Sequence, residues 1–168
     1  MPPAIRIADT NDLTGLEEIE NDADVILVDR LNPEVWTPAP SAAERMGRRG
    51  YVLVLAEDDG GDAIGFAHVL LIPGWAHLEQ VSVLPAHARH GHGRALVESA
   101  KREARALGCE IMTLRTFADI PWNAPFYASC GFVEAEPSTP FERELIHAEE
   151  EAGILDLGRR IEMICHIG

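Results

Sequence analysis

The chain has 168 residues, enough for one domain whose core needs no disulfide or metal to hold it together. Its hydrophobic share of 46% and charged share of 25% are typical of a globular domain, and no apolar run approaches the length of a membrane span. The formal net charge of −14 argues against nucleic-acid binding, because proteins that bind nucleic acid carry basic faces.

The cysteines and the ends of the chain bear on where the protein works. The opening residues, MPPAIRIADT, lack the apolar stretch of a secretory signal peptide. Cys109, Cys130 and Cys165 are widely spaced and form no Cys-x-x-Cys pair, as is typical of buried, reduced thiols, so we expect a cytoplasmic protein. No repeat, low-complexity tract or linker appears, and we expect residues 1–168 to form a single domain.

Hydrophobic periodicity and turn residues predict the elements of the first half of the chain. In chain order these are a strand at 4–9, a helix at 10–23, a proline-rich loop at 32–40, a short helix from Ser41 to about Arg48, and a hairpin of strands 51–57 and 63–72. Ser41 and Glu44 have the spacing of a capping box, which favours a helix start at this point.

The second half alternates strands with helices. It predicts a strand at 77–83, a helix at 92–107, a strand at 110–116, a short helix at 122–130, a strand at 131–136, an acidic helix at 140–154 and a closing strand at 160–167. Early antiparallel strands followed by two strand–helix units imply an α/β fold, with a mixed sheet of six to seven strands and helices on its faces.

One segment, PAHARHGHGRALVESA (85–100), joins a predicted strand to a predicted helix and carries most of the chemical information. Helix N-termini expose unpaired N–H groups at the positive end of the helix dipole, and glycine at 91 and 93 lets an anion approach the backbone closely. The segment is also unusually basic for this acidic chain, since five of the 14 lysines and arginines lie between Arg89 and Arg105. We therefore expect a phosphate-bearing ligand here.

Other interpretations of this segment fit less well. A Walker loop needs a lysine after its glycines, and a dinucleotide-binding fold needs a third glycine where Leu96 stands. His87, His90 and His92 are potential zinc ligands, but the loop has no nearby Cys, Asp or Glu to complete a site, so we expect no metal and a phosphate-facing or solvent-facing role.

The surrounding sequence resembles the GCN5-related N-acetyltransferase (GNAT) superfamily. LEQVSVLPAHARHGHGRALVESA (78–100) is similar to the family's acetyl-CoA loop, and WNAPFYASCGFVEAE (122–136) is similar to its second signature, in which an aromatic–Tyr pair leads to Gly-Phe. The resemblance is specific from about residue 63 to 136. It implies the GNAT fold, in which two central parallel strands splay apart, and transfer of an acetyl group from acetyl-CoA to an amine.

The resemblance also implies which residues hold acetyl-CoA. The backbone of Val81, Ser82 and Val83 would pair with the pantetheine arm. The pyrophosphate would lie against the loop formed by Ala88, Arg89, His90, Gly91, His92, Gly93 and Arg94. The Gln/Arg position of the family loop falls on Ala88, so any side-chain salt bridge to phosphate would come from Arg89 or Arg94.

The second signature adds two cofactor candidates, Phe126 and Asn123. Phe126 precedes the family tyrosine, Tyr127, whereas Asn123 lies four residues before it and not seven, where this chain has Ile120. Asn123 would therefore either reach the cofactor from another turn or cap the helix that begins there.

The resemblance makes Tyr127 the acid that protonates the leaving thiolate. For the base, residues at every second position of strand 77–83 are expected to share a face, so that His77, Glu79, Val81 and Val83 point together. Glu79 is the first candidate, with His77 and water as alternatives. Glu79 is equally interpreted as a plain surface carboxylate or as one that anchors the substrate.

The regions that form the acceptor pocket in the family are acidic here and suit a cationic amine. The residues concerned are Glu17, Glu18, Glu20, Asp22, Asp24, Glu142, Glu144 and Glu149 to Glu151. General solubility is an alternative explanation for this charge. A small amine, a peptide N-terminus and a lysine side chain all remain open as acceptors. A homodimer and a GNAT-like domain that senses acyl-CoA without turnover also remain open.

Overall fold

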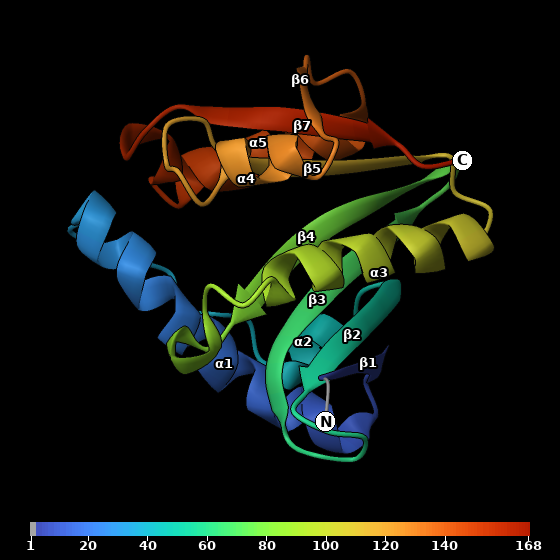
Figure 1. Cartoon of the computed structure of the whole chain (residues 1–168). Helices are drawn as coiled ribbons and strands as arrows, with labels where there is room; N and C mark the ends of the chain where they lie inside the picture. Colours follow the sequence, from blue (N-terminus) through green and yellow to red (C-terminus); the bar gives the residue numbers. More distant parts are fainter. Residues whose placement is uncertain (1–2) are drawn as a thin grey trace.

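A computed structural model describes residues 3–168 and contains a seven-stranded mixed sheet (Figure 1). The strands are β1 (Ala4–Ile7), β2 (Gly50–Ala56), β3 (Ala63–Ile72), β4 (Trp75–Val83), β5 (Ile111–Phe117), β6 (Val133–Ala135) and β7 (Arg160–His166). Their order in the sheet is β1-β2-β3-β4-β5-β7-β6, and every neighbouring pair is antiparallel except β4 and β5. The predicted α/β class and strand number are confirmed.

The parallel pair is in contact only at its start. Ala76 pairs with Met112 and His77 with Thr113, after which the two strands diverge and leave a gap that widens toward their carboxyl ends (Figure 1). This is the splayed central pair that the family resemblance implies.

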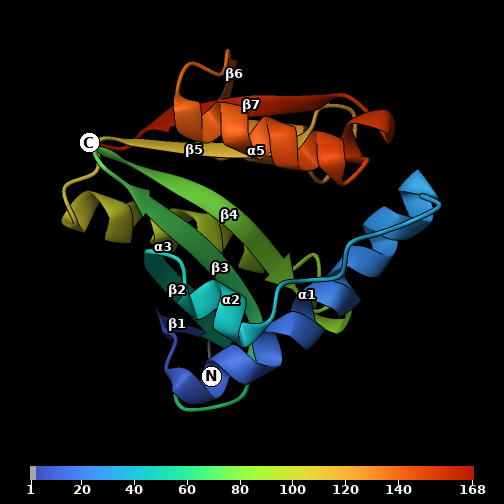
Figure 2. The same cartoon turned by 180° about the vertical axis from the view of Figure 1, so that it is seen from behind.

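Helices cover both faces of the sheet, as predicted. They are α1 (Thr10–Leu31), α2 (Ala42–Met46), α3 (His92–Ala106), α4 (Ala124–Ser129) and α5 (Pro140–Glu151), with short 3-10 turns at Pro85–His87 and Ile154–Asp156. α3 lies on one face of strands β2 to β4, while α1 and α2 lie on the other, where α5 covers the β5–β7 half (Figures 1 and 2). Among residues 3–168, none of the helices combines the length and apolar character that a membrane span requires.

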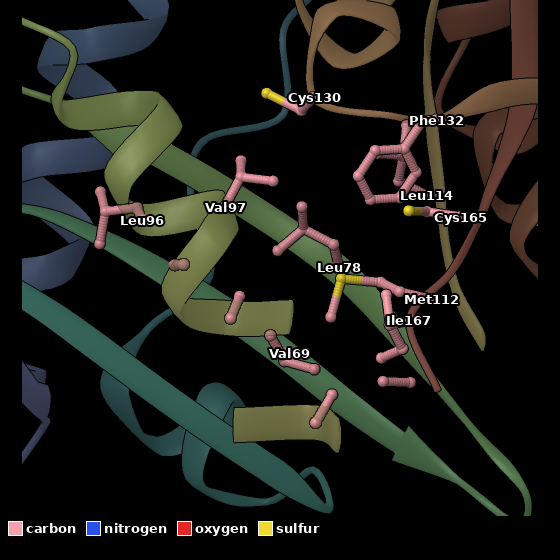
Figure 3. Close-up of a cluster of buried hydrophobic side chains, with 14 of the residues drawn as sticks. Val69, Leu78, Leu96, Val97, Met112, Leu114, Cys130, Phe132, Cys165 and Ile167 are labelled. Atoms are coloured by element: carbon pink, nitrogen blue, oxygen red, sulfur yellow. The ribbon is translucent and has the colours of Figure 1, made fainter. Parts of the chain in front are cut away.

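Two clusters of buried side chains hold these layers together. The larger one joins α3 to both halves of the divided sheet, because Leu78 of β4 and Met112 of β5 belong to it together with Val97 and Phe132 (Figure 3). The smaller one packs α1 against the opposite face of β2 and β3; its buried members are Leu16, Ile19, Val52, Val54 and Phe66. The larger cluster therefore keeps the two halves of the sheet in register where few strand hydrogen bonds do so.

α1 is longer than predicted. It starts as expected, with a capping box between Asp9 and Asp12, but it continues past residue 23 to Leu31. Asn32 ends it in a left-handed conformation, and Pro33 follows. The sequence missed the extension because the run at 25–28 is uniformly apolar and lacks helical periodicity; Val25 and Ile26 are in fact exposed.

Candidate active site

The loop between β4 and α3 is shaped to expose the helix N-terminus. Gly91 is the N-cap of α3, in a left-handed conformation with φ of 78°, and no side chain caps the helix. The first N–H groups of α3 therefore lack an intrahelical partner and carry the positive end of the helix dipole. A Cβ added at Gly91 would meet no atom within 4 Å, so the space beside these N–H groups is open.

The three histidines of the loop have different nearest neighbours. The imidazole of His87 lies 3.6 Å from a carboxylate oxygen of Glu57, whereas the rings of His90 and His92 are 5.7 Å apart. Partial burial, followed by the neighbouring His90 and His87, lowers the pKa of His92. Within residues 3–168, no group of three His, Cys, Asp or Glu side chains is arranged to hold a metal ion.

The two arginines of the loop differ in their side-chain environment. Arg89 is exposed and has a left-handed backbone with φ of 64°. Arg94 also lies at the surface, but its guanidinium donates to the carbonyl and the hydroxyl of Ser129, at 3.0 and 2.7 Å. Of the two, Arg89 is the one whose side chain has no hydrogen-bond partner among the described residues.

A β-bulge in β4 overturns the expected common face of the strand. Gln80 pairs with His68 and Leu78 with Val69, which leaves Glu79 as an extra residue between them. Val81 and Val83 consequently pack against the larger core on the α3 side, whereas His77 packs edge-on against Phe141 of α5 on the opposite face. The expectation that His77 shares a face with Val81 and Val83 is wrong.

Beyond His77, β4 has no strand partner on its β5 side within the described chain. The polar backbone groups of this edge face the gap, and an extended ligand can pair with them as an added strand would. Val81, Ser82 and Val83 lie along this edge; Ser82 is buried and accepts a hydrogen bond from Gln80 at 3.0 Å.

Glu79 and His77 are neighbours with different surroundings. Glu79 is partly exposed and lies 3.3 Å from the guanidinium of Arg48 and 3.7 Å from the imidazole of His77. His77 is buried, its Nδ1 lies 2.8 Å from the hydroxyl of Thr113, and burial lowers its pKa to about 3. A histidine with so low a pKa is neutral at pH 7 and a weak proton acceptor, so His77 is a poor candidate for the base.

Tyr127 lies in α4, the helix that follows β5 on the far side of the gap. Its ring packs edge-on against Phe126 and Phe132, with centroids 5.1 and 6.1 Å away. Its hydroxyl has no hydrogen-bond partner among the side chains and backbone groups of residues 3–168. Burial, with a smaller effect from Cys130, raises the pKa of Tyr127 to about 12. The phenol therefore keeps its proton at neutral pH and can donate it.

Asn123 occupies the N-cap position of α4, but its side chain does not cap the helix. Its carboxamide oxygen instead accepts a hydrogen bond from Thr116 of β5, at 2.8 Å. The capping interpretation is therefore wrong for this side chain, and its contact with the cofactor stays a prediction. Phe126 lies against the first turn of α3, because a Cβ on Gly93 would approach its ring to 3.4 Å.

Two arginines lie on the same side of the gap, although no local sequence pattern selects them. Arg45 is buried, pairs with Glu20 of α1 at 2.5 Å and lies over the ring of Phe66. Arg48 contacts Glu79, as described above. Asp24 lies one turn after Glu20 in α1. Burial, and to a smaller extent the charge of Glu20, raise the pKa of Asp24 to about 7. The acidic side of the gap is therefore a mixed network of carboxylates and arginines.

Comparison with known proteins gives this geometry a family. The acetyltransferase (GNAT) family matches residues 15–132, which is well over half of the chain. The chain belongs to this family. The GNAT match covers the whole loop before α3 and the second signature as far as the Gly131-Phe132 turn, where it ends.

Individual GNAT relatives are similar over different lengths. The mycothiol acetyltransferase of Saccharomonospora viridis is 38% identical over 78 residues, which are 45% of this chain and 25% of that protein. This GNAT chain thus matches about a quarter of the length of its curated relative.

Solved structures match almost the whole fold. The ribosomal-protein-S18-alanine N-acetyltransferase of Escherichia coli superposes with a TM-score of 0.71 at 24% identity, covering 99% of this chain and 94% of its own. The PaiA N-acetyltransferase of Thermoplasma acidophilum, in complex with coenzyme A, gives 0.70 at 16% identity and covers 99% of both chains. Rv2747 of Mycobacterium tuberculosis, in complex with CoA, gives 0.68 at 20% identity, covering 98% of this chain and 99% of its own.

Proposed function

We propose that this GNAT chain transfers the acetyl group of acetyl-CoA to a primary amine by direct attack within a ternary complex. The observation that carries the proposal is the juxtaposition of three features around one gap. These are the unpaired edge of β4, the uncapped N-terminus of α3 at Gly91, and Tyr127 on the helix that follows β5.

Acetyl-CoA fits the described residues. The open space beside Gly91 and the exposed first N–H groups of α3 suit a pyrophosphate, and the edge of β4 from Val81 to Val83 suits the pantetheine arm. When bound, acetyl-CoA supplies an activated thioester. The β4 edge would hold that group straight, and a backbone N–H along the same edge would polarise its carbonyl.

Tyr127 would donate its phenolic hydrogen to the departing sulfur. With a pKa of about 12, complete transfer to a thiolate of ordinary pKa, about 8.5, is unfavourable, so Tyr127 acts best as a hydrogen-bond donor while negative charge develops. Glu79 would accept the proton that the amine loses, directly or through one water, while Arg48 orients its carboxylate.

The acceptor is proposed to be a cationic amine. Glu20, Asp24 and Glu79 lie around the same side of the gap, since the charge of Glu20 acts on Asp24 and that of Glu79 on Glu20. Arg45 and Arg48 offset part of this charge, so attraction of a cation over distance would rest mainly on the formal net charge of −14. Small amines, peptide N-termini and lysine side chains are all included, because the named relatives act on acceptors of different kinds. The three cysteines, all buried and free, support a cytoplasmic setting.

The test is release of CoA thiol from acetyl-CoA across a panel of amines, with Tyr127→Phe as the matched variant. We expect turnover with at least one cationic amine and a fall in kcat of about 10²-fold in Tyr127→Phe, at nearly constant affinity for acetyl-CoA. Tight CoA binding without turnover on any amine class would support the sensor alternative instead. Full activity of Tyr127→Phe, with chemistry rate-limiting, would remove the tyrosine from the mechanism.

A further inference from the structure

We propose that Arg94 and Lys101, both on α3, are positioning residues that hold α4, and with it Tyr127, at a fixed distance from the phosphate loop. The inference rests on the role proposed for Tyr127. Its basis is that two cations of one helix donate to the final carbonyls of another.

Arg94 makes the first connection. Its Nη1 donates to the carbonyl of Ser129 at 3.0 Å and its Nη2 to the hydroxyl of Ser129 at 2.7 Å. That hydroxyl in turn donates to the carbonyl of Phe126 at 2.5 Å, one turn back in α4. Both terminal nitrogens of the guanidinium are therefore directed at α4, although the backbone of Arg94 belongs to the first turn of α3.

Lys101 makes the second connection, two turns further along the same side of α3. Its ammonium donates to the carbonyl of Cys130 at 2.6 Å, pairs with Glu98 at 2.9 Å and lies 5.7 Å from the ring centre of Phe132. The side chain is nearly buried. A charged group in such a place needs these partners, so its removal would leave the carbonyl of Cys130 without a donor.

These contacts act on the part of α4 that has least support of its own. α4 has six residues, too few to be stable as an isolated helix. Backbone N–H groups of residues 130–132 reach the carbonyls of Tyr127 and Ala128, whereas those of Ser129 and Cys130 accept from Arg94 and Lys101. Cations at a helix C-terminus satisfy those carbonyls and stabilise the helix dipole. Tyr127 lies in the middle of this helix and its hydroxyl is not anchored, so the placement of α4 sets the placement of the phenol.

α3 thus presents phosphate-binding N–H groups at its start and two anchors for Tyr127 along its side. A ligand held by the loop would have its sulfur at a set distance from the phenol. Displacement by about 1 Å at a reacting centre costs up to about 10²-fold in rate. Loss of either side chain, Arg94 or Lys101, should therefore reduce kcat and leave the affinity for the phosphates of CoA unchanged.

The experiment compares Arg94→Met and Lys101→Met with Arg102→Met as the matched control. Arg102 is exposed on the same helix, and its one side-chain hydrogen bond among the described residues goes to Ser99 on α3 itself, so we expect no change in the kinetics of its variant. For each of the other two we expect kcat to fall about 10-fold, while the Kd for CoA, measured by calorimetry, stays within about twofold. Assays are run well below the measured Tm of each variant. Arg94 is exposed, so its variant should fold even if the buried lysine proves indispensable.

A double-mutant cycle separates positioning from general damage. In a Tyr127→Phe background, Arg94→Met and Lys101→Met should cost less than about twofold further in kcat, because the group they position has lost its proton. An undiminished loss in that background would overturn the inference. So would a raised Kd for CoA at constant kcat in Arg94→Met, since this would make the side chain a phosphate ligand. Full activity of the single variant Tyr127→Phe would overturn both the proposed role of Tyr127 and this inference. That outcome is distinct from the two above, because it is measured with Arg94 and Lys101 unchanged.

Discussion

The anion site at the start of α3 can be tested with a single added charge, by comparing Gly91→Asp with Gly91→Asn. Gly91 has a φ of 78°, in the left-handed region that Asn and Asp tolerate better than other side chains. An added Cβ meets no atom within 4 Å, so both side chains fit the space. Both are also good N-cap residues of nearly equal size. The two variants therefore differ essentially by one negative charge.

The size of the effect follows from where that charge would lie. A carboxylate on Gly91 would be about 5 Å from a phosphate held by the first N–H groups of α3, where two like charges repel by about 1 kcal/mol in water and about 3 kcal/mol at an effective dielectric constant of 20. The Kd for CoA should therefore be about 5-fold to about 150-fold higher in the Asp variant than in the Asn variant. Calorimetry at low and high salt provides the measurement, and the difference should shrink at high salt. Equal affinities in two folded variants would refute the placement of the pyrophosphate at this loop.

Three further predictions concern titrating groups near the gap. The pKa of Asp24 is raised to about 7, so the folded state loses stability as pH rises from about 4 to about 7. Asp24→Asn should therefore raise the free energy of unfolding by about 1–3 kcal/mol at pH 8 and change it little at pH 4. Asp22→Asn, at an exposed position of the same helix, is the control. The pKa of His77 is lowered to about 3, so below pH 6.5 the unfolded state binds a proton at this residue that the folded state does not bind. Between pH 6.5 and 4 the free energy of unfolding should therefore fall less steeply in His77→Gln than in the unsubstituted protein, as measured by denaturation curves. If Glu79 is the base, Glu79→Gln should lower kcat and remove the acidic limb of its pH profile; loss of affinity for the amine at constant kcat would indicate an anchoring role instead.

Much of the fold could be predicted from the sequence because its signals are local. Strand alternation, the turn residues and the helical stripe of α3 each depend on residues close together in the chain, and the elements lie where these patterns place them. The phosphate loop could be predicted for the same reason, since Gly91 and Gly93 at a strand-to-helix turn let an anion approach the backbone N–H groups closely.

The parts that could not be predicted depend on partners far apart in the sequence. Arg48 meets Glu79, and Arg94 meets Ser129, across 31 and 35 residues respectively. Nothing in the local sequence at Arg48 or Arg94 specifies such a partner. The splay of β4 from β5 could be expected only from the family resemblance, because the pairing of parallel strands leaves no short-range signature in the sequence.

The bulge at Glu79 is the most consequential feature of this kind. Its position is set by how β3 and β4 pair, and WAHLEQVSV contains no glycine that would mark it. Strict alternation would place Glu79 with Val81 and Val83, on the side of α3. With one extra residue in the strand, Glu79 keeps the face of His77, where it meets Arg48, while Val81 and Val83 lie on the opposite face.

Because of the bulge, the candidate functional residues of β4 lie on two different faces of the sheet. Val81 and Val83 pack toward α3, where the phosphate loop and Tyr127 belong, whereas Glu79 joins the acidic network of α1 on the other face. In the proposed reaction the amine and the thioester therefore approach from opposite sides. They can meet only where the sheet is open, which is beyond the last β4–β5 pair, His77 with Thr113. Glu79 is the second residue past that point, so the bulge brings a carboxylate to the place where the strands first separate. A base at this position needs no lid or partner chain to reach the amine, because the divided sheet itself connects the two faces.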